Sequence, residues 1–146
     1  MPRPNITPAL CGTLAYAIVV VVVLILPASK PHPRGGFLAE YYLTLGRRAI
    51  FDIASNMLLF APLGWGLHRV GRLLRVNASA LGVAVGAVAG LFSLTMESVQ
   101  YFALTYRYSS IVDVAANTAG ALIGALAERI SANGPSSRPC TRTASR

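Results

Sequence analysis

The stretch SALGVAVGAVAGLFSLTMES, residues 79–98, decides the fold, because its 20 residues carry a single charged side chain, Glu97. A helix of about 20 apolar residues is long enough to cross the hydrocarbon core of a bilayer. Three further apolar runs of similar length lie at residues 9–27, 50–68 and 111–128. Because backbone polar groups must be satisfied inside lipid, each run is expected to form a helix. The sequence therefore predicts an all-α polytopic membrane protein, a bundle of four transmembrane helices with short loops.

The composition of the 146-residue chain also favours a membrane protein over a soluble one. Hydrophobic residues make up 54% of the chain and charged residues 12%, whereas about 25% of the residues in a soluble domain are charged. The residues outside the four runs are too few and too scattered to form a second core. We therefore expect one membrane domain over residues 1–130, followed by a disordered cytoplasmic tail over residues 131–146.

The formal net charge of +8 indicates topology signals and contacts with anionic membrane lipids. No basic stretch carries the aromatic and polar residues of a nucleic-acid-binding module, so no nucleic-acid partner is expected. His32 and His68 fall at opposite faces of the membrane, which excludes a bis-histidine haem site or a His-rich zinc site within it. No cofactor and no metal are expected.

Lys and Arg residues are divided unevenly between the two sides of a four-span chain. One side holds eight of them and the other side holds five. The eight are Arg3, Arg69, Arg72, Arg75, Arg129, Arg138, Arg142 and Arg146. Because the richer side is the cytoplasmic one, both termini are expected in the cytoplasm of a bacterial inner membrane.

Polar side chains within the apolar runs are the candidate functional residues. An ionisable group at mid-membrane costs about 2.5–3.5 kcal/mol on insertion scales, so something must compensate for it. Three pairs occur, Asp52 with Asn56, Glu97 with Gln100, and Asp113 with Asn117. Because the second and fourth runs cross inward and the third crosses outward, all three pairs fall at one depth in the outer leaflet. The inner ends are expected to hold nothing comparable.

Helical spacing indicates that these polar residues share faces with glycines. Asp113, Asn117, Gly120 and Gly124 follow steps of four, three and four residues, and Gly82, Gly86 and Gly90 repeat every four residues ahead of Glu97. Small residues on one face let neighbouring helix backbones approach closely. We therefore expect the glycines to pack against other helices and the polar groups to face the bundle interior. Arg107, in the loop beyond Gln100, is expected to reach back to the carboxylates.

The order and spacing of these residues resemble the VanZ-like family of bacterial membrane proteins. The resemblance covers residues 41–127 and is carried by Asp52-x3-Asn56-x3-Phe60-x-Pro62-x-Gly64, Glu97-x2-Gln100, Arg107 and Asp113-x3-Asn117-x2-Gly120-x3-Gly124. It implies a small four-helix protein of the bacterial cytoplasmic membrane. The family takes its name from a member associated with teicoplanin resistance, so the resemblance also points to the cell envelope.

Three functions are open at this stage. The first is binding or modulation of a cell-envelope lipid or lipid-linked precursor by a polar pocket in the outer leaflet. The second is a membrane-embedded enzyme acting on a lipid head group, with a carboxyl as acid or base or with Asp52, Glu97 and Asp113 around a hard cation. The third is a small transporter, which ranks last because the polar groups gather at one depth. No nucleophile motif or phosphate loop identifies a reaction, and nothing fixes the oligomeric state.

A structural interpretation of the same residues is open as well. The polar residues can form a satisfied network that fixes the register of the helices. Pro62, inside the second run, is expected to kink or locally unwind its helix.

Overall fold

The computed structural model describes residues 5–26, 47–103 and 110–134, with the backbone alone at residues 47–49. Four helices make up this part of the chain: α1 (Thr7–Ile25), α2 (Arg47–Leu73), α3 (Ala78–Ala103) and α4 (Ile111–Asn133). Each is long and apolar enough to cross a membrane, and the described residues contain no strand. The predicted all-α bundle of four membrane-spanning helices is confirmed.

The helices extend beyond the predicted apolar runs. α2 continues five residues past residue 68, to Leu73, and α4 continues past residue 128 to Asn133. The boundary placed after residue 130 therefore falls inside a helix, because helical hydrogen bonding continues where the chain leaves the apolar region. Residues 135–146, expected as a disordered tail, lie outside the described residues.

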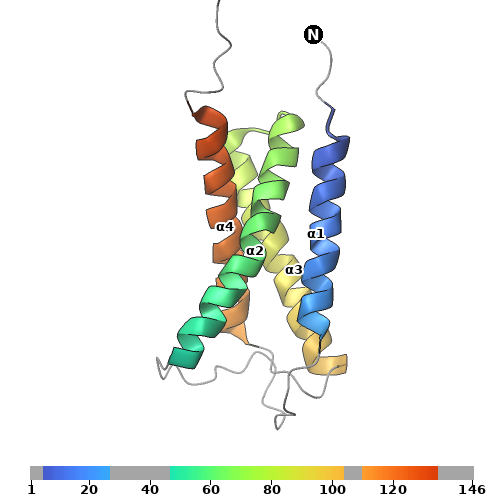
Figure 1. The fold of residues 1–146 in the computed structure, drawn as a ribbon, viewed down its shortest axis with the longest axis vertical. Helices are drawn as coiled ribbons and strands as arrows, with labels where there is room; N and C mark the ends of the chain where they lie inside the picture. Colours follow the sequence, from blue (N-terminus) through green and yellow to red (C-terminus); the bar gives the residue numbers. More distant parts are fainter. Residues whose placement is uncertain (1–4, 27–46, 104–109, 135–146) are drawn as a thin grey trace, which may run out of the picture.

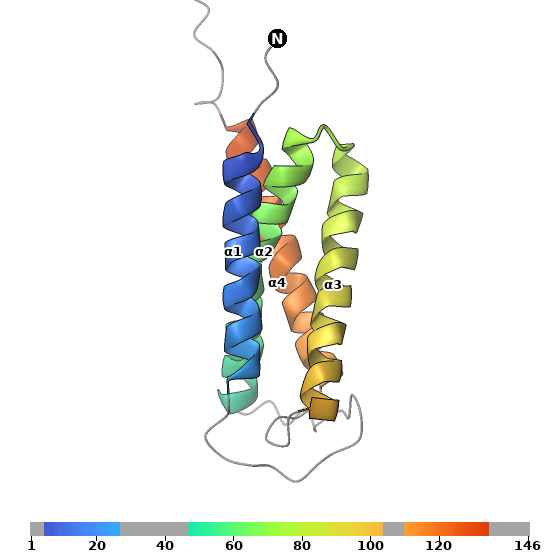
Figure 2. The ribbon, with the colours of Figure 1, turned by 90° about the vertical axis from the view of Figure 1, so that its right-hand side faces the viewer.

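The helices alternate in direction along the bundle (Figure 1). α1 begins and α4 ends at one end, which we call the terminal end, and the opposite end is called the loop end. Because successive helices alternate, α2 and α4 run parallel, both from the loop end toward the terminal end. α1 packs mainly on α2, and α3 packs mainly on α4 (Figure 2).

The closest packing in the bundle joins α2 and α4 through glycines. A Cβ atom on Gly120 would overlap the carbonyl oxygen of Met57, and one on Gly124 would overlap that of Ala61. In the opposite sense, a Cβ atom on Gly64 would overlap the carbonyl oxygen of Ala121. Gly120 and Gly124, which were expected to pack against another helix, lie in this close contact, where only a hydrogen atom fits between the backbones.

The glycines of α3 behave differently. The buried face of α3 is formed mainly by Leu81, Val85, Ala89, Ser93, Met96, Glu97 and Gln100. Gly82 would meet nothing within 4 Å, while Gly86 and Gly90 would meet only side-chain atoms at 3.4 Å. The predicted glycine face at these three positions is wrong as a backbone contact. Neighbouring residues on a helix are 100° apart, and the adjacent stripe with larger side chains fills the core better.

Pro62 is accommodated without interruption of α2, which is helical throughout Arg47–Leu73. The expected local unwinding is absent. The proline lacks the N–H that would donate to the carbonyl oxygen of Leu58. The neighbouring carbonyl oxygen, that of Leu59, accepts a hydrogen bond from the hydroxyl of Tyr16 at 3.0 Å. This bond fastens α1 to α2 beside the proline.

Candidate functional site

Six polar residues near the loop end form what we call the loop-end cluster: Asn56, Ser93, Glu97, Gln100, Asp113 and Asn117. Asn56 of α2 donates through Nδ2 to Oδ1 of Asp113 on α4 at 2.7 Å. Because α2 and α4 run parallel, these two residues meet in the same part of the bundle, as their predicted common depth requires. Asn56 and Asp113 are both partly buried.

Asn117 is among the most deeply buried residues of the cluster. Its side chain is 1% exposed, and its Nδ2 donates to Oγ of Ser93 on α3 at 2.8 Å. Its Oδ1 is buried and has no hydrogen-bond partner in the part of the chain that the structure describes. A buried amide oxygen without a donor is uncommon in proteins, since most buried polar atoms are paired. The cluster thus contains one hydrogen-bond acceptor whose capacity is unused.

Glu97 and Gln100 connect α3 to the ends of its neighbours. Glu97 is 3% exposed, and its Oε2 accepts from the backbone N–H of Ser110 at 2.9 Å. Ser110 is the N-cap of α4, where its side chain accepts from the N–H of Val112. Gln100, also buried, donates through Nε2 to the carbonyl oxygen of Leu24 at 3.1 Å. Leu24 lies in the last turn of α1, where carbonyls lack partners within the helix.

The structure brings together five of the seven residues that the sequence singled out: Asn56, Glu97, Gln100, Asp113 and Asn117. Asp52 is exposed on α2, so its predicted orientation toward the bundle interior is wrong. It lies one helical turn from Asn56, nearer the loop end, next to Ile50 and Phe51, which are exposed as well. Arg107 lies outside the described residues.

Sequence reasoning missed Ser93 as a member of the cluster. Ser93 is fully buried and lies four residues before Glu97, so the two share one helix face. A serine inside an apolar run, one turn from a carboxylate, was the signal that could have identified it.

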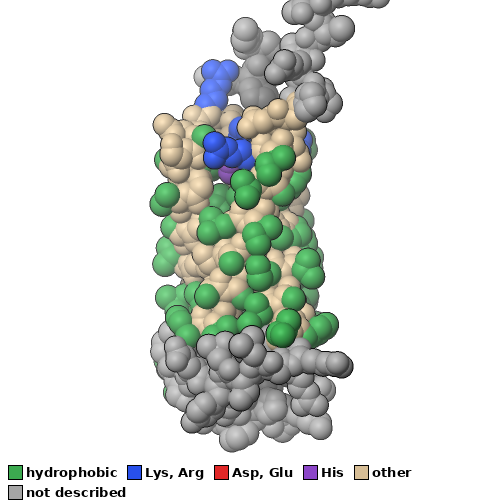
Figure 3. Space-filling model, turned by 90° about the vertical axis from the view of Figure 1, so that its left-hand side faces the viewer, with side chains coloured by type: hydrophobic (Ala, Val, Ile, Leu, Met, Phe, Trp, Pro, Cys, Tyr) green, Lys and Arg blue, Asp and Glu red, His purple; other side chains and the backbone are tan. Residues whose placement is uncertain are grey.

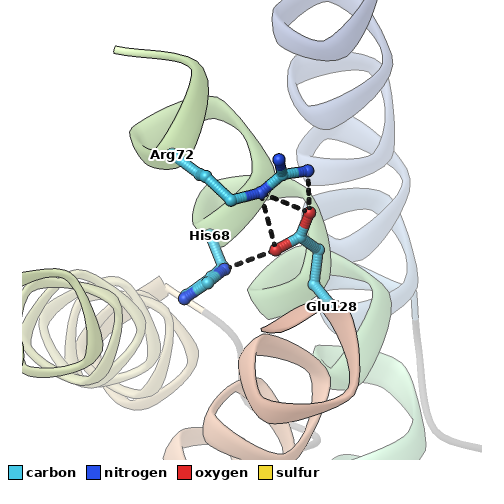
Figure 4. A network of polar contacts seen from close by, with 3 residues as sticks. All are labelled: His68, Arg72 and Glu128. Carbon is cyan, nitrogen blue, oxygen red and sulfur yellow. Dashed lines mark hydrogen bonds and ion pairs between the residues drawn. The ribbon is translucent and has the colours of Figure 1, made fainter. Parts of the chain in front are cut away.

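A second polar network lies at the terminal end and joins α2 to α4 (Figure 4). Nδ1 of His68 lies 2.6 Å from Oε2 of Glu128. Arg72 donates to Oε1 of the same carboxylate from Nη2 at 2.6 Å and from Nε at 3.1 Å. Glu128 is 2% exposed and His68 is buried as well. We call His68, Arg72 and Glu128 the terminal-end triad.

The expectation that this end holds nothing comparable is therefore wrong, and so is the expectation that all intramembrane polar groups gather at one depth. His68 and Glu128 are the last residues of two predicted apolar runs, and ionisable residues are common at the ends of transmembrane helices. The parallel arrangement of α2 and α4 brings these ends together. His68 and Arg72 are four residues apart and so share a helix face, which was the available signal.

An apolar layer separates the two polar regions along α2 and α4. Between Asn117 and Glu128, about 16 Å apart along the helix axis, the buried residues of α4 are Gly120, Ala121, Gly124 and Ala125. Phe60 and Leu63 of α2 are buried in the same core. The described residues therefore form two polar regions with a hydrophobic layer between them, rather than one polar route.

The chemistry available at either end follows from these donor sets. Among the residues that the structure describes, no group of three or more His, Cys, Asp and Glu side chains could hold a metal ion. The loop-end cluster offers two carboxylates, two amide groups and the unused oxygen of Asn117. These are groups that accept hydrogen bonds from hydroxyls and ammonium ions.

Comparison with known proteins places these helices in a family. The model of the VanZ/LLP1 family matches residues 13–131, which run from within α1 almost to the end of α4. No match was found among curated proteins or among solved structures.

Proposed function

The chain belongs to the VanZ/LLP1 family of membrane proteins, and we propose that its loop-end cluster binds the polar group of a cell-envelope lipid or lipid-linked precursor. Through that binding the protein modulates the chemistry of the envelope surface. The proposal places the protein in the bacterial cytoplasmic membrane with both termini in the cytoplasm and the loop end outward, as the distribution of Lys and Arg favours.

The observation that carries the proposal is the unused acceptor on Asn117. Leaving a buried polar group without a partner costs about 1–3 kcal/mol, and Asn117 Oδ1 has no donor among the described side chains and backbone. A donor from a ligand removes this cost. Hydroxyl and ammonium groups, which envelope lipids and their precursors carry, are donors of the required type.

The surroundings of Asn117 support the same ligand chemistry. Asp113 lies one helical turn before Asn117 on α4, and Glu97 lies one turn beyond Ser93, the α3 residue that Asn117 bonds. Intramembrane carboxyl groups are expensive and are commonly found where a membrane protein acts on a ligand or an ion. An amide oxygen and carboxylates together favour a ligand that donates hydrogen bonds over one that accepts them.

The experiment is identification of the lipids that remain bound to the protein after purification from bacterial membranes in mild detergent, by mass spectrometry. Glu97→Gln removes the charge but keeps an oxygen that can accept from Ser110 N–H. Ser98→Ala is the matched control, because Ser98 is partly exposed and its hydroxyl donates within its own helix, to Leu94 O. We expect a specific envelope lipid to be enriched with the parent protein and with Ser98→Ala and to be lost with Glu97→Gln. Equal lipid profiles for all three proteins would contradict the proposal.

A further inference from the structure

We propose that the terminal-end triad forms a second ligand site, which binds the phosphate group of an anionic phospholipid. This site is independent of the loop-end cluster, since the apolar layer around Phe60 and Ala121 lies between them. Its ligand has the opposite character: the loop-end cluster offers acceptors, whereas the triad offers donors.

The guanidinium of Arg72 is the group that would contact the phosphate. Arg72 uses Nε and Nη2 to bind Glu128, which leaves Nη1 without a partner among the described residues. Its side chain is 46% exposed, and Figure 4 shows the second terminal nitrogen directed away from the carboxylate. The N–H groups of Nη1 are charge-assisted donors held in the fixed guanidinium plane, and a phosphate oxygen is a suitable acceptor for them.

Glu128 and His68 hold this guanidinium in place before any ligand arrives. The buried carboxylate of Glu128 binds two nitrogens of Arg72 on one side, and Nδ1 of His68 lies against its other oxygen. A side chain that is already ordered loses less conformational entropy when it binds. The triad therefore presents a pre-oriented donor instead of a flexible surface arginine.

The electrostatic surroundings favour an anion. Arg69 and Arg75, near the end of α2, and Arg129 on α4 are exposed at the same end. Glu128 is the one acidic residue that the structure describes at this end, and Arg72 and His68 already engage it. Basic residues grouped at a membrane surface attract anionic head groups.

The apolar surface below the triad favours a phospholipid over a free phosphate ion. Leu122, Ile123 and Leu126, which precede Glu128 on α4 and so lie on its loop-end side, are exposed. Figure 3 shows arginine side chains beside a histidine at the terminal end, directly above a surface of hydrophobic side chains. A phospholipid whose phosphate meets Arg72 can lay its acyl chains along this surface, whereas inorganic phosphate gains nothing from it.

Native mass spectrometry of the purified full-length protein, titrated with phosphatidylglycerol or phosphatidylcholine, tests the proposal. The double variant Arg72→Gln/Glu128→Gln keeps the net charge and leaves no buried carboxylate, and we expect it to bind phosphatidylglycerol about tenfold more weakly than the parent protein. The control Arg129→Gln removes one positive charge from the same end without touching the triad. We expect its affinity for phosphatidylglycerol to fall by less than about threefold, because it only weakens the overall positive potential at this end.

Two results would overturn the proposal. One is equal weakening by Arg129→Gln and the double variant, which would mean that charge alone attracts the lipid. The other is inorganic phosphate at millimolar concentration displacing the lipid, which would identify a free anion as the ligand. Should the double variant fail to fold, Arg72→Lys provides the same test, because a lysine keeps a positive charge beside Glu128 but lacks the second terminal nitrogen that would contact the phosphate. Unchanged phosphatidylglycerol affinity in Arg72→Lys would also contradict the site.

Discussion

Nδ1 of His68 lies 2.6 Å from Oε2 of Glu128, although the two residues are 60 positions apart in the chain. The contact exists because α2 and α4 run parallel and meet through Gly64, Gly120 and Gly124. Where helix backbones approach this closely, side chains one or two turns further on are held in register with each other. The same pair of helices positions Asn56 against Asp113 at the loop end.

The ion pair between Arg72 and Glu128 should show strong coupling. Arg72→Gln alone leaves a carboxylate that is 2% exposed with less compensation, whereas Glu128→Gln alone leaves a guanidinium that can turn to water. We expect the first variant to be the more destabilised. The double variant should recover about 1–3 kcal/mol relative to the sum of the single effects. Thermal unfolding of the four proteins in one detergent measures this, and purely additive losses would show that the pair does not act as a unit.

Gly124 and Gly82 make a matched pair for the packing between helices. Gly124→Ala places a methyl group on the carbonyl oxygen of Ala61, so we expect a loss of about 1–3 kcal/mol of stability. Gly82→Ala meets nothing within 4 Å, and replacing a glycine inside a helix by alanine favours the helix by up to about 1 kcal/mol. Melting temperatures in detergent should therefore move in opposite directions. A similar fall at both sites would refute the assignment of the α2–α4 contact as the close one.

Arg75 closes α2 in a conformation that suits glycine. The φ of Arg75 is 61°, in the left-handed region. The N–H of Val76 donates to the carbonyl oxygen of Gly71, and the N–H of Arg75 donates to the carbonyl oxygen of Arg72. This pattern is a Schellman motif, whose left-handed residue is usually glycine. Arg75→Gly should raise stability by about 1 kcal/mol, because it removes the steric cost of this backbone conformation. Arg75→Ala, which keeps a Cβ atom, is the control and should give no comparable rise in melting temperature.

The orientation of the bundle predicts the behaviour of reporter fusions. The side with eight Lys and Arg residues should be cytoplasmic. A reporter active only outside the cytoplasm should be active when fused after Arg34 or Arg107 and silent when fused after Arg75 or at the carboxy terminus. The reverse pattern would turn the protein over in the membrane and place the loop-end cluster on the cytoplasmic side.

The fold could be predicted because hydrophobic length is a local property of the sequence. Each apolar run contains its own reason to form a helix, and directions follow from alternation. Asp113 and Asn117 could be predicted to face the bundle interior because steps of four residues to Asn117 and of three to Gly120 keep all three on one helix face. The close backbone contact at Gly120 then fixes which helix that face meets.

The failures arise where a pairwise contact decides the outcome. Asp52 shares a face with Asn56, but exposure depends on how far α4 covers α2, which spacing cannot state. The glycines of α3 have perfect spacing, yet the stripe beginning at Leu81 is the one that is buried. The triad was missed because neither His68 nor Glu128 is informative alone, and their meeting depends on the crossing of two helices.

Ligand binding by the loop-end cluster is tested most directly by one measurement, in which lipid retention and melting temperature are determined together on Glu97→Gln and Asp113→Asn. Both replacements keep an oxygen where Ser110 N–H and Asn56 Nδ2 donate, so the links between helices can persist without the charges. We predict that both variants lose the bound envelope lipid while their melting temperatures, measured after lipid removal, stay within about 3 °C of the lipid-free parent protein, a difference of about 1 kcal/mol. Lipid retention that falls only in step with melting temperature would contradict the account and leave the cluster a structural network.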